Sequence, residues 1–387
     1  MRRSTTHVTH WKGWSMKWPN PFSRTGHASP LLAFLKTRRL QPSLPPEDFS
    51  LLLAEARACG LLGHVAHRLH RETAAPDAAE VPHDFLPQVR GASVQARAFR
   101  SDVLRELSFL QAALSKLPSP VLLLKGAAYV LLDLPPANGR QFSDIDVLVP
   151  SPHLAEAESA LMLRGWSTGR LDAYDARYYR EWSHEVPPMT HIQRGTTVDL
   201  HHALAMPTCR QPIDSNRMIA DAIPVHGSDF WWRLRDEDMV LHAAAHLLLN
   251  SEFDHALRDL SDIDLLYRHF SDGNPDFGPQ LCARARNVGL ENILQQAAHL
   301  ARTLFDTPFP EATGCSARNA PVVWLLSRAA TTRHPLTRPF GQQPADAILM
   351  LREMYLRLPN RLLAVHLRHK LNTLMPWRKT ETPERAG

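Results

Sequence analysis

Residues 121–149 read VLLLKGAAYVLLDLPPANGRQFSDIDVLV, and the rest of the chain is organised around this stretch. The pattern predicts a strand, a helix opened by glycine, a loop and a second strand. The second strand carries Asp144 and Asp146, separated by one apolar residue. Residues i and i+2 of a strand point to the same face, roughly 6.5 Å apart along the chain. Two carboxylates placed in this way can hold one divalent cation or bridge two.

The same stretch offers a place for an anion. Lys125 and Gly126 end the first predicted strand and open the helix. The N–H groups at a helix start favour phosphate, and a glycine lets the backbone approach it closely. Arg140 precedes the aspartate pair by four residues and could either hold a phosphate or pair with Asp146. A nucleoside triphosphate with its magnesium ions needs both an anion site and an acidic cation site.

A later predicted strand adds a third carboxylate. Residues 189–194 and 196–201 predict a hairpin across Gly195. In its second arm, TTVDLH, the alternation puts Asp199 and His201 on one face and the apolar residues on the other. We expect Asp199 to complete the site of the aspartate pair. For His201 two interpretations stay open, a role in the site and a purely structural role.

These motifs resemble the signature of the polymerase-beta-like nucleotidyltransferase superfamily, and most closely its bacterial branch of uncharacterised nucleotidyltransferases. The matching pieces are LKG at 124–126, Arg140, DIDVLV at 144–149, VDLHH at 198–202 and LRDLSDI at 257–263. The resemblance spans roughly residues 48–270. Two positions depart from the pattern: Ala127 stands where the superfamily has a second Gly or Ser, and His202 stands where the family often has Trp.

The resemblance implies an α+β fold, in which a small mixed β-sheet core is flanked by N-terminal and C-terminal helical lobes. It implies transfer of a nucleoside monophosphate from an NTP, such as ATP, to a hydroxyl of an unknown acceptor. Two Mg²⁺ ions can clamp the attacking and leaving oxygens of such a reaction. The residues implied are Asp144, Asp146 and Asp199 for the metals and catalysis, and Lys125, Gly126 and Arg140 for the nucleotide.

Two other interpretations stay open. The departure at Ala127 would fit a catalytically decayed transferase fold that binds a nucleotide or a partner. The protein could also be an accessory of a peptide or polysaccharide biosynthetic cluster, since members of the family are suggested to accompany such clusters.

The sequence predicts five parts along the chain. These are a basic, disordered extension at 1–46, a helical lobe at 47–118, the nucleotidyltransferase-like core at 119–232, a second helical lobe at 233–372 and a frayed tail at 373–387. Apolar residues recur every three or four positions in 48–71, 92–117, 236–250 and 254–270, which predicts helices. The motif SDID at 261–264 repeats the text of the aspartate strand. On a helix, however, residues i and i+2 diverge by about 200°, so Asp262 and Asp264 cannot chelate together.

The chain has 21 histidines, which raises the question of a metal site. His242 and His246 stand at i and i+4 of a predicted helix, a spacing that can bind zinc, but without the Glu of an H-E-x-x-H motif. We expect instead that this helix packs behind the active site, where His246 hydrogen-bonds a carboxylate such as Asp262. His184 and His201 could reach the site for acceptor binding or to support its ligands.

The net charge of +5 is unevenly placed. Residues 1–46 hold eight Lys or Arg and no acid, whereas the other 341 residues hold 36 basic and 39 acidic residues. A balance of −3 is not that of a broadly basic nucleic-acid binder. We therefore expect a small molecule, peptide or saccharide as the acceptor. In the extension, Trp11, Trp14 and Trp18 would share a helical face beside lysines and could contact a membrane surface or a partner.

Two further features indicate the compartment. No apolar run reaches 18 residues, so we expect no transmembrane segment. The four cysteines lie far apart with no C-x-x-C pair, which favours free thiols in a reducing cytoplasm over a zinc ribbon or disulfides.

Overall fold

The computed structural model describes residues 29–40, 44–72, 81–249, 253–314 and 319–374. The predicted contact surface at Trp11, Trp14 and Trp18 lies outside these residues, as do Cys315 and the last thirteen residues of the tail. Cys59, Cys209 and Cys282, within the described chain, are free thiols. In this part of the chain no helix has the length and apolarity needed to cross a membrane.

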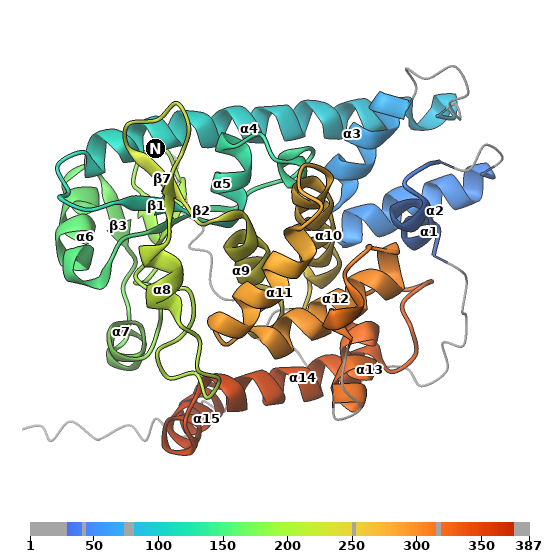
Figure 1. Cartoon of the computed structure of the whole chain (residues 1–387). Helices are drawn as coiled ribbons and strands as arrows, with labels where there is room; N and C mark the ends of the chain where they lie inside the picture. Colours follow the sequence, from blue (N-terminus) through green and yellow to red (C-terminus); the bar gives the residue numbers. More distant parts are fainter. Residues whose placement is uncertain (1–28, 41–43, 73–80, 250–252, 315–318, 375–387) are drawn as a thin grey trace, which may run out of the picture.

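Seven short strands form one mixed sheet (Figure 1). The strands are β1 Val121–Leu123, β2 Asp144–Leu148, β3 Trp166–Thr168, β4 Met189–His191, β5 Thr197–His201, β6 Ile223–Pro224 and β7 Trp231–Arg233. Their order across the sheet is β3-β4-β5-β2-β1-β7-β6. β2 runs parallel to β5 and β1 runs parallel to β7, whereas the other neighbours are antiparallel. The two strands that carry the aspartates are therefore neighbours in the middle of the sheet.

Helices make up most of the remaining chain. Before the sheet come α1 Pro30–Thr37, α2 Pro46–Ala58, α3 Leu62–Glu72 and α4 Leu86–Leu114. Between strands lie α5 Lys125–Leu131, α6 Leu154–Leu163, α7 Ala173–Glu181 and α8 Ser215–Ala220. After the sheet come α9 Asp236–Leu249, α10 Ala256–Asp272, α11 Phe277–Asn287, α12 Glu291–Phe305, α13 Ala320–Ala329, α14 Gln342–Arg357 and α15 Asn360–Leu374. This architecture confirms the predicted α+β class.

The core joins the sheet to the helices that follow it. α9 is buried almost all round, as expected for a helix with apolar residues on every side, and it packs against α10, α11 and α12. Figure 1 shows α9 between the sheet and these helices. In the same view α13, α14 and α15 lie along the edge of the molecule that is opposite α4. The aspartate strands and the C-terminal helices thereby share one continuous interior.

The N-terminal helices differ from the prediction in two places. The predicted helix at 48–71 is two helices, because Gly60 adopts a φ of +68°, a left-handed conformation that ends α2. The prediction of a disordered extension was wrong for residues 30–37, which form α1. Ser29 caps this helix by accepting a hydrogen bond from the backbone N–H of Leu32, and its apolar face is buried.

Basic residues of the predicted extension hold α1 in place. Lys36 pairs with Asp306 over 3.0 Å, and Arg38 pairs with the buried carboxylate of Asp264. The same Asp264 accepts from Arg268, whereas Asp262 pairs with Arg140. The second SDID motif is thus helical as predicted, and its two aspartates serve separate ion pairs.

Candidate active site

Three carboxylates share one face in the middle of the sheet. The parallel register of β2 and β5 pairs Asp146 with Asp199. Paired residues of neighbouring strands point to the same face, and Asp144 shares this face because it lies two residues before Asp146. The structure therefore brings together the three aspartates named from the sequence.

Asp146 is the most strongly paired of the three. Lys125 Nζ lies 2.7 Å from Asp146 Oδ1, and His201 Nε2 lies 3.0 Å from the same oxygen. Burial acts to raise the pKa of Asp146, but the Lys125 ammonium and the His201 hydrogen bond hold it well below its usual range. Asp146 is therefore ionised at neutral pH.

The pKa values of the other two carboxylates, Asp144 and Asp199, are raised rather than lowered. Burial, followed by repulsion from Asp146, raises the pKa of Asp144. Burial, followed by repulsion from Asp146, Glu185 and Asp144, raises the pKa of Asp199 to about 8. Asp199 Oδ1 is buried and has no hydrogen-bond partner among the described residues. Carboxylates crowded in this way become stable as anions when a cation binds between them.

The three aspartates fit divalent cations. They supply only oxygen ligands, which Mg²⁺ prefers, and the Lys125 ammonium already stands against Asp146 where a cation would. They do not form a group in which all ligand atoms lie within 4.8 Å of one another. The arrangement therefore does not suit one ion bound by all three carboxylates.

Nitrogen ligands lie beside these oxygens. The ligand atoms of His184, Glu185 and His201 do lie within 4.8 Å of one another. Glu185 Oε2 is 3.5 Å from His201 Nε2 and 3.8 Å from His184 Nε2. A β-bridge between Glu185 and His201 brings the group together. Glu185 was missed in the sequence, because nothing near it in the chain indicates that it pairs with β5.

Lys125 and Gly126 form the start of α5, where the backbone conformation and the close packing constrain both residues. The Leu124 N–H donates to Asp146 O over 3.1 Å, so the chain enters α5 directly beside β2. Lys125 has a φ of +41°, a conformation that residues with side chains rarely adopt. A Cβ on Gly126 would lie 2.5 Å from two ring carbons of Phe142, so only glycine leaves room for this ring. Close approach of a phosphate to Gly126 stays a prediction.

The ion-pair partner of Arg140 differs from the one that the sequence suggested. It does not pair with Asp146: its guanidinium forms a buried ion pair with Asp262 on α10 and lies 5.9 Å from the ring centroid of Tyr129. The suggested pairing of His246 with Asp262 was also wrong, because His246 Nδ1 faces Asp259 at 3.9 Å. Arg140 therefore ties the loop before β2 to the C-terminal helices, and its binding to a nucleotide stays a prediction.

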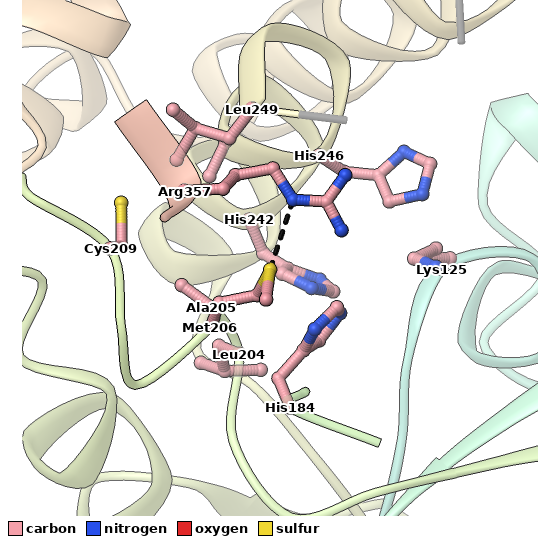
Figure 2. A pocket seen from close by; sticks show the side chains of 11 residues that line it. Lys125, His184, Leu204, Ala205, Met206, Cys209, His242, His246, Leu249 and Arg357 are labelled. Carbon is pink, nitrogen blue, oxygen red and sulfur yellow. Dashed lines mark hydrogen bonds between the residues drawn. The ribbon is translucent and has the colours of Figure 1, made fainter. Parts of the chain in front are cut away.

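A pocket opens next to Lys125, between the loop after β5 and helices α9 and α14 (Figure 2). Its cavity volume is about 30 Å³. Its lining consists of Lys125, His184, Leu204, Ala205, Met206, Cys209, His242, Ala245, His246, Leu249 and Arg357. Figure 2 shows Arg357 and Lys125 on opposite sides of the pocket, with the imidazoles between them. His242 and His246 thus face the pocket, and Arg357 was not predicted because it lies about 150 residues beyond the loop that it meets.

The imidazoles of the pocket are neutral. Burial, followed by the positive charge of Lys125, lowers the pKa of His242 well below its usual range and that of His246 to about 3. Burial, followed by His201 and Arg357, lowers the pKa of His184 in the same way. Lys125 and Arg357 are therefore the cationic side chains of the lining.

We predict that Asp199→Asn stabilises the metal-free protein increasingly as the pH rises. The carboxyl titrates near 3.8 when unfolded and near 8 when folded, so between these values the folded state holds the extra proton. Raising the pH through this window therefore costs stability, and above it the full cost is present. Thermal unfolding in a metal chelator should show no advantage of the variant below pH 3.8 and a growing one up to about pH 8. An advantage that does not depend on pH would contradict this electrostatic picture.

The comparisons with known proteins agree with the geometry of the aspartates. A family model described as uncharacterised nucleotidyltransferase matches residues 45–306, which include the whole sheet and α9 to α12 but not α13, α14 or α15. No curated protein and no solved structure matches the chain. The family match covers more than half of the 387 residues. The chain therefore belongs to the uncharacterised nucleotidyltransferase family.

Proposed function

We propose that the protein is a Mg²⁺-dependent nucleotidyltransferase that moves a nucleoside monophosphate from an NTP to a hydroxyl of an acceptor. The observation that carries this proposal is the register of β2 and β5, which puts Asp144, Asp146 and Asp199 on one face. The family match supports the class of reaction. The oxygen of the acceptor hydroxyl forms a bond to the α-phosphorus of the NTP and releases its proton. The bond between the α-phosphorus and the oxygen that bridges it to the β-phosphorus breaks, so that pyrophosphate leaves.

The aspartates would hold the metal ions. Bound Mg²⁺ would neutralise the charge on the phosphates and favour loss of the acceptor proton. His201 keeps Asp146 ionised and oriented through its hydrogen bond. Lys125 would leave Asp146 when a cation takes its place, and its ammonium would then be available to the triphosphate near the start of α5.

Labelled nucleotides test this proposal. Purified protein is incubated with cell extract, Mg²⁺ and an NTP labelled either at the α- or at the γ-phosphate. We expect a new product labelled from the α-phosphate only, and none when a chelator removes Mg²⁺. A product labelled from the γ-phosphate would show phosphoryl transfer and overturn the proposal. Absence of any labelled product with all four NTPs would count against it as well.

A further inference from the structure

The pocket beside Lys125 has a positively charged, partly apolar lining that the transfer reaction itself does not explain. Its cationic groups are far apart in the sequence, Lys125 at the start of α5 and Arg357 at the end of α14. α14 lies beyond the residues that match the family. Arg357 is therefore a contribution of this chain's own C-terminal helices to the neighbourhood of the aspartates.

The position of Arg357 is built by specific contacts. Its Nη2 lies 3.3 Å from the hydroxyl of Tyr178 on α7, and its Nε lies 3.0 Å from Met206 Sδ, the contact drawn in Figure 2. A small apolar cluster anchors the end of α14 at the same point, where Leu358 is buried against Trp182 and Met206. The guanidinium is thereby held at the pocket rather than left on a mobile surface side chain.

The charges around the pocket favour an anion. Arg357 is close enough to lower the pKa of His184, so its field reaches the wall nearest the aspartates. Two of the nearby carboxylates are already engaged, since Asp146 pairs with Lys125 and Glu185 lies against the two histidines. Burial raises the pKa of Glu353, one turn before Arg357 on α14, to about 9. Neutral imidazoles add donors without adding charge. A planar guanidinium with several N–H groups matches the oxygens of a phosphate or carboxylate.

The part of the lining next to Arg357 is apolar. Leu204, Ala205, Met206 and Leu249 line the pocket beside Arg357. Pockets that combine a few convergent polar groups with an apolar wall are typical of small-molecule sites. A cavity of about 30 Å³ has room for one acidic group of a ligand, and the rest of the ligand would lie outside it. A ligand that presents an acidic group to Arg357 and a short apolar part to this wall would use both features.

We propose that this pocket binds the acceptor, through an acidic group, phosphate or carboxylate, that Arg357 fixes so that the acceptor hydroxyl lies beside the aspartates. The inference rests on the proposed function and narrows the acceptor to an acidic small molecule. Arg357 acts here as a residue that determines specificity. The same acidic chemistry could be offered by the triphosphate of the NTP, so the test has to separate these sources.

Phosphate binding provides the test without any need for turnover. Isothermal titration calorimetry with inorganic phosphate, in the absence of nucleotide, should give binding to the wild-type protein. Arg357→Ala should weaken this binding about tenfold or more, because a charge-assisted contact is lost. Arg357→Lys should restore part of it. Arg361→Ala is the matched control, since Arg361 is exposed at the start of α15 and should not affect binding. The fold of each variant is checked by thermal unfolding.

A second titration identifies the source of the acidic group. Phosphate is titrated into protein saturated with Mg²⁺ and a non-hydrolysable NTP analogue. Unchanged phosphate affinity supports an acceptor site, whereas displacement of phosphate by the analogue means that the triphosphate fills the pocket and overturns the assignment. Equal phosphate binding by Arg357→Lys, Arg357→Ala and the wild type would overturn it too, as would absence of binding to the wild type. These results are independent of the label transfer that tests the proposed function.

Discussion

Asp146→Asn is expected to reduce transfer of the α-phosphate label by about a thousandfold, since one charged oxygen ligand and its electrostatic effect are lost together. The amide keeps an oxygen that can accept from Lys125 and His201, so the hydrogen bonds at 2.7 Å and 3.0 Å have a substitute and the fold should survive. What changes is the negative charge that would attract a cation between β2 and β5. The measurement is the initial rate of label transfer at saturating Mg²⁺, beside the thermal unfolding of the same preparation.

Asp133→Asn is the matched control for this prediction. Asp133 has a φ of +53°, which asparagine tolerates, and its side chain is 78% exposed in a surface pair with Arg100. Asp133→Asn replaces a carboxylate by an amide, as Asp146→Asn does, but at a position away from the sheet. This variant should transfer label at the wild-type rate. If Asp146→Asn folds and transfers label as fast as this control, the aspartate face is not the catalytic site.

Arg140→Ala is expected to destabilise the protein by about 3–5 kcal/mol, because it leaves the carboxylate of Asp262 buried without its partner. The two side chains are only 10% and 5% exposed, and they join the loop before β2 to α10. The double variant Arg140→Ala/Asp262→Ala removes both charges. Its loss in free energy of unfolding should be much smaller than the sum of the losses of Arg140→Ala and Asp262→Ala. Denaturant unfolding of the four proteins measures this coupling.

A surface pair serves as the comparison. Arg100→Ala breaks an ion pair of 2.9 Å with the exposed Asp133 and should cost at most about 1 kcal/mol. If Arg140→Ala lowers the free energy of unfolding no more than Arg100→Ala does, the ion pair with Asp262 does not stabilise the packing of α10. If it leaves stability unchanged but abolishes nucleotide binding, the sequence interpretation of Arg140 as a phosphate contact would be restored.

The central part of the site could be predicted from the sequence because it depends on short-range periodicity. The spacing of Asp144 and Asp146 and the alternation in TTVDLH each place side chains on a face with a period of two. The family resemblance implied that Asp199, on a later strand, joins the aspartate pair, and in the structure the register of β2 and β5 pairs Asp146 with Asp199. The same reasoning about period identified the second SDID motif as part of a helix.

The surroundings of the site could not be predicted in this way, because they depend on how distant helices pack. Arg140 meets Asp262, and His246 meets Asp259, one turn away from the residue that the spacing suggested. Either carboxylate is compatible with the sequence, and only the rotation of α10 against α9 selects between them. Glu185 and Arg357 reach the site through a single bridge and through a helix end, neither of which leaves a pattern in the sequence.

The most direct test of the proposed function is a crystal structure with Mn²⁺ in place of Mg²⁺ and a non-hydrolysable NTP analogue, in which anomalous scattering locates each ion. We expect Mn²⁺ bound by carboxylate oxygens of Asp144, Asp146 and Asp199, with the triphosphate at the start of α5 and Lys125 withdrawn from Asp146. Metal and nucleotide bound elsewhere, with the pair of Lys125 and Asp146 intact, would contradict it.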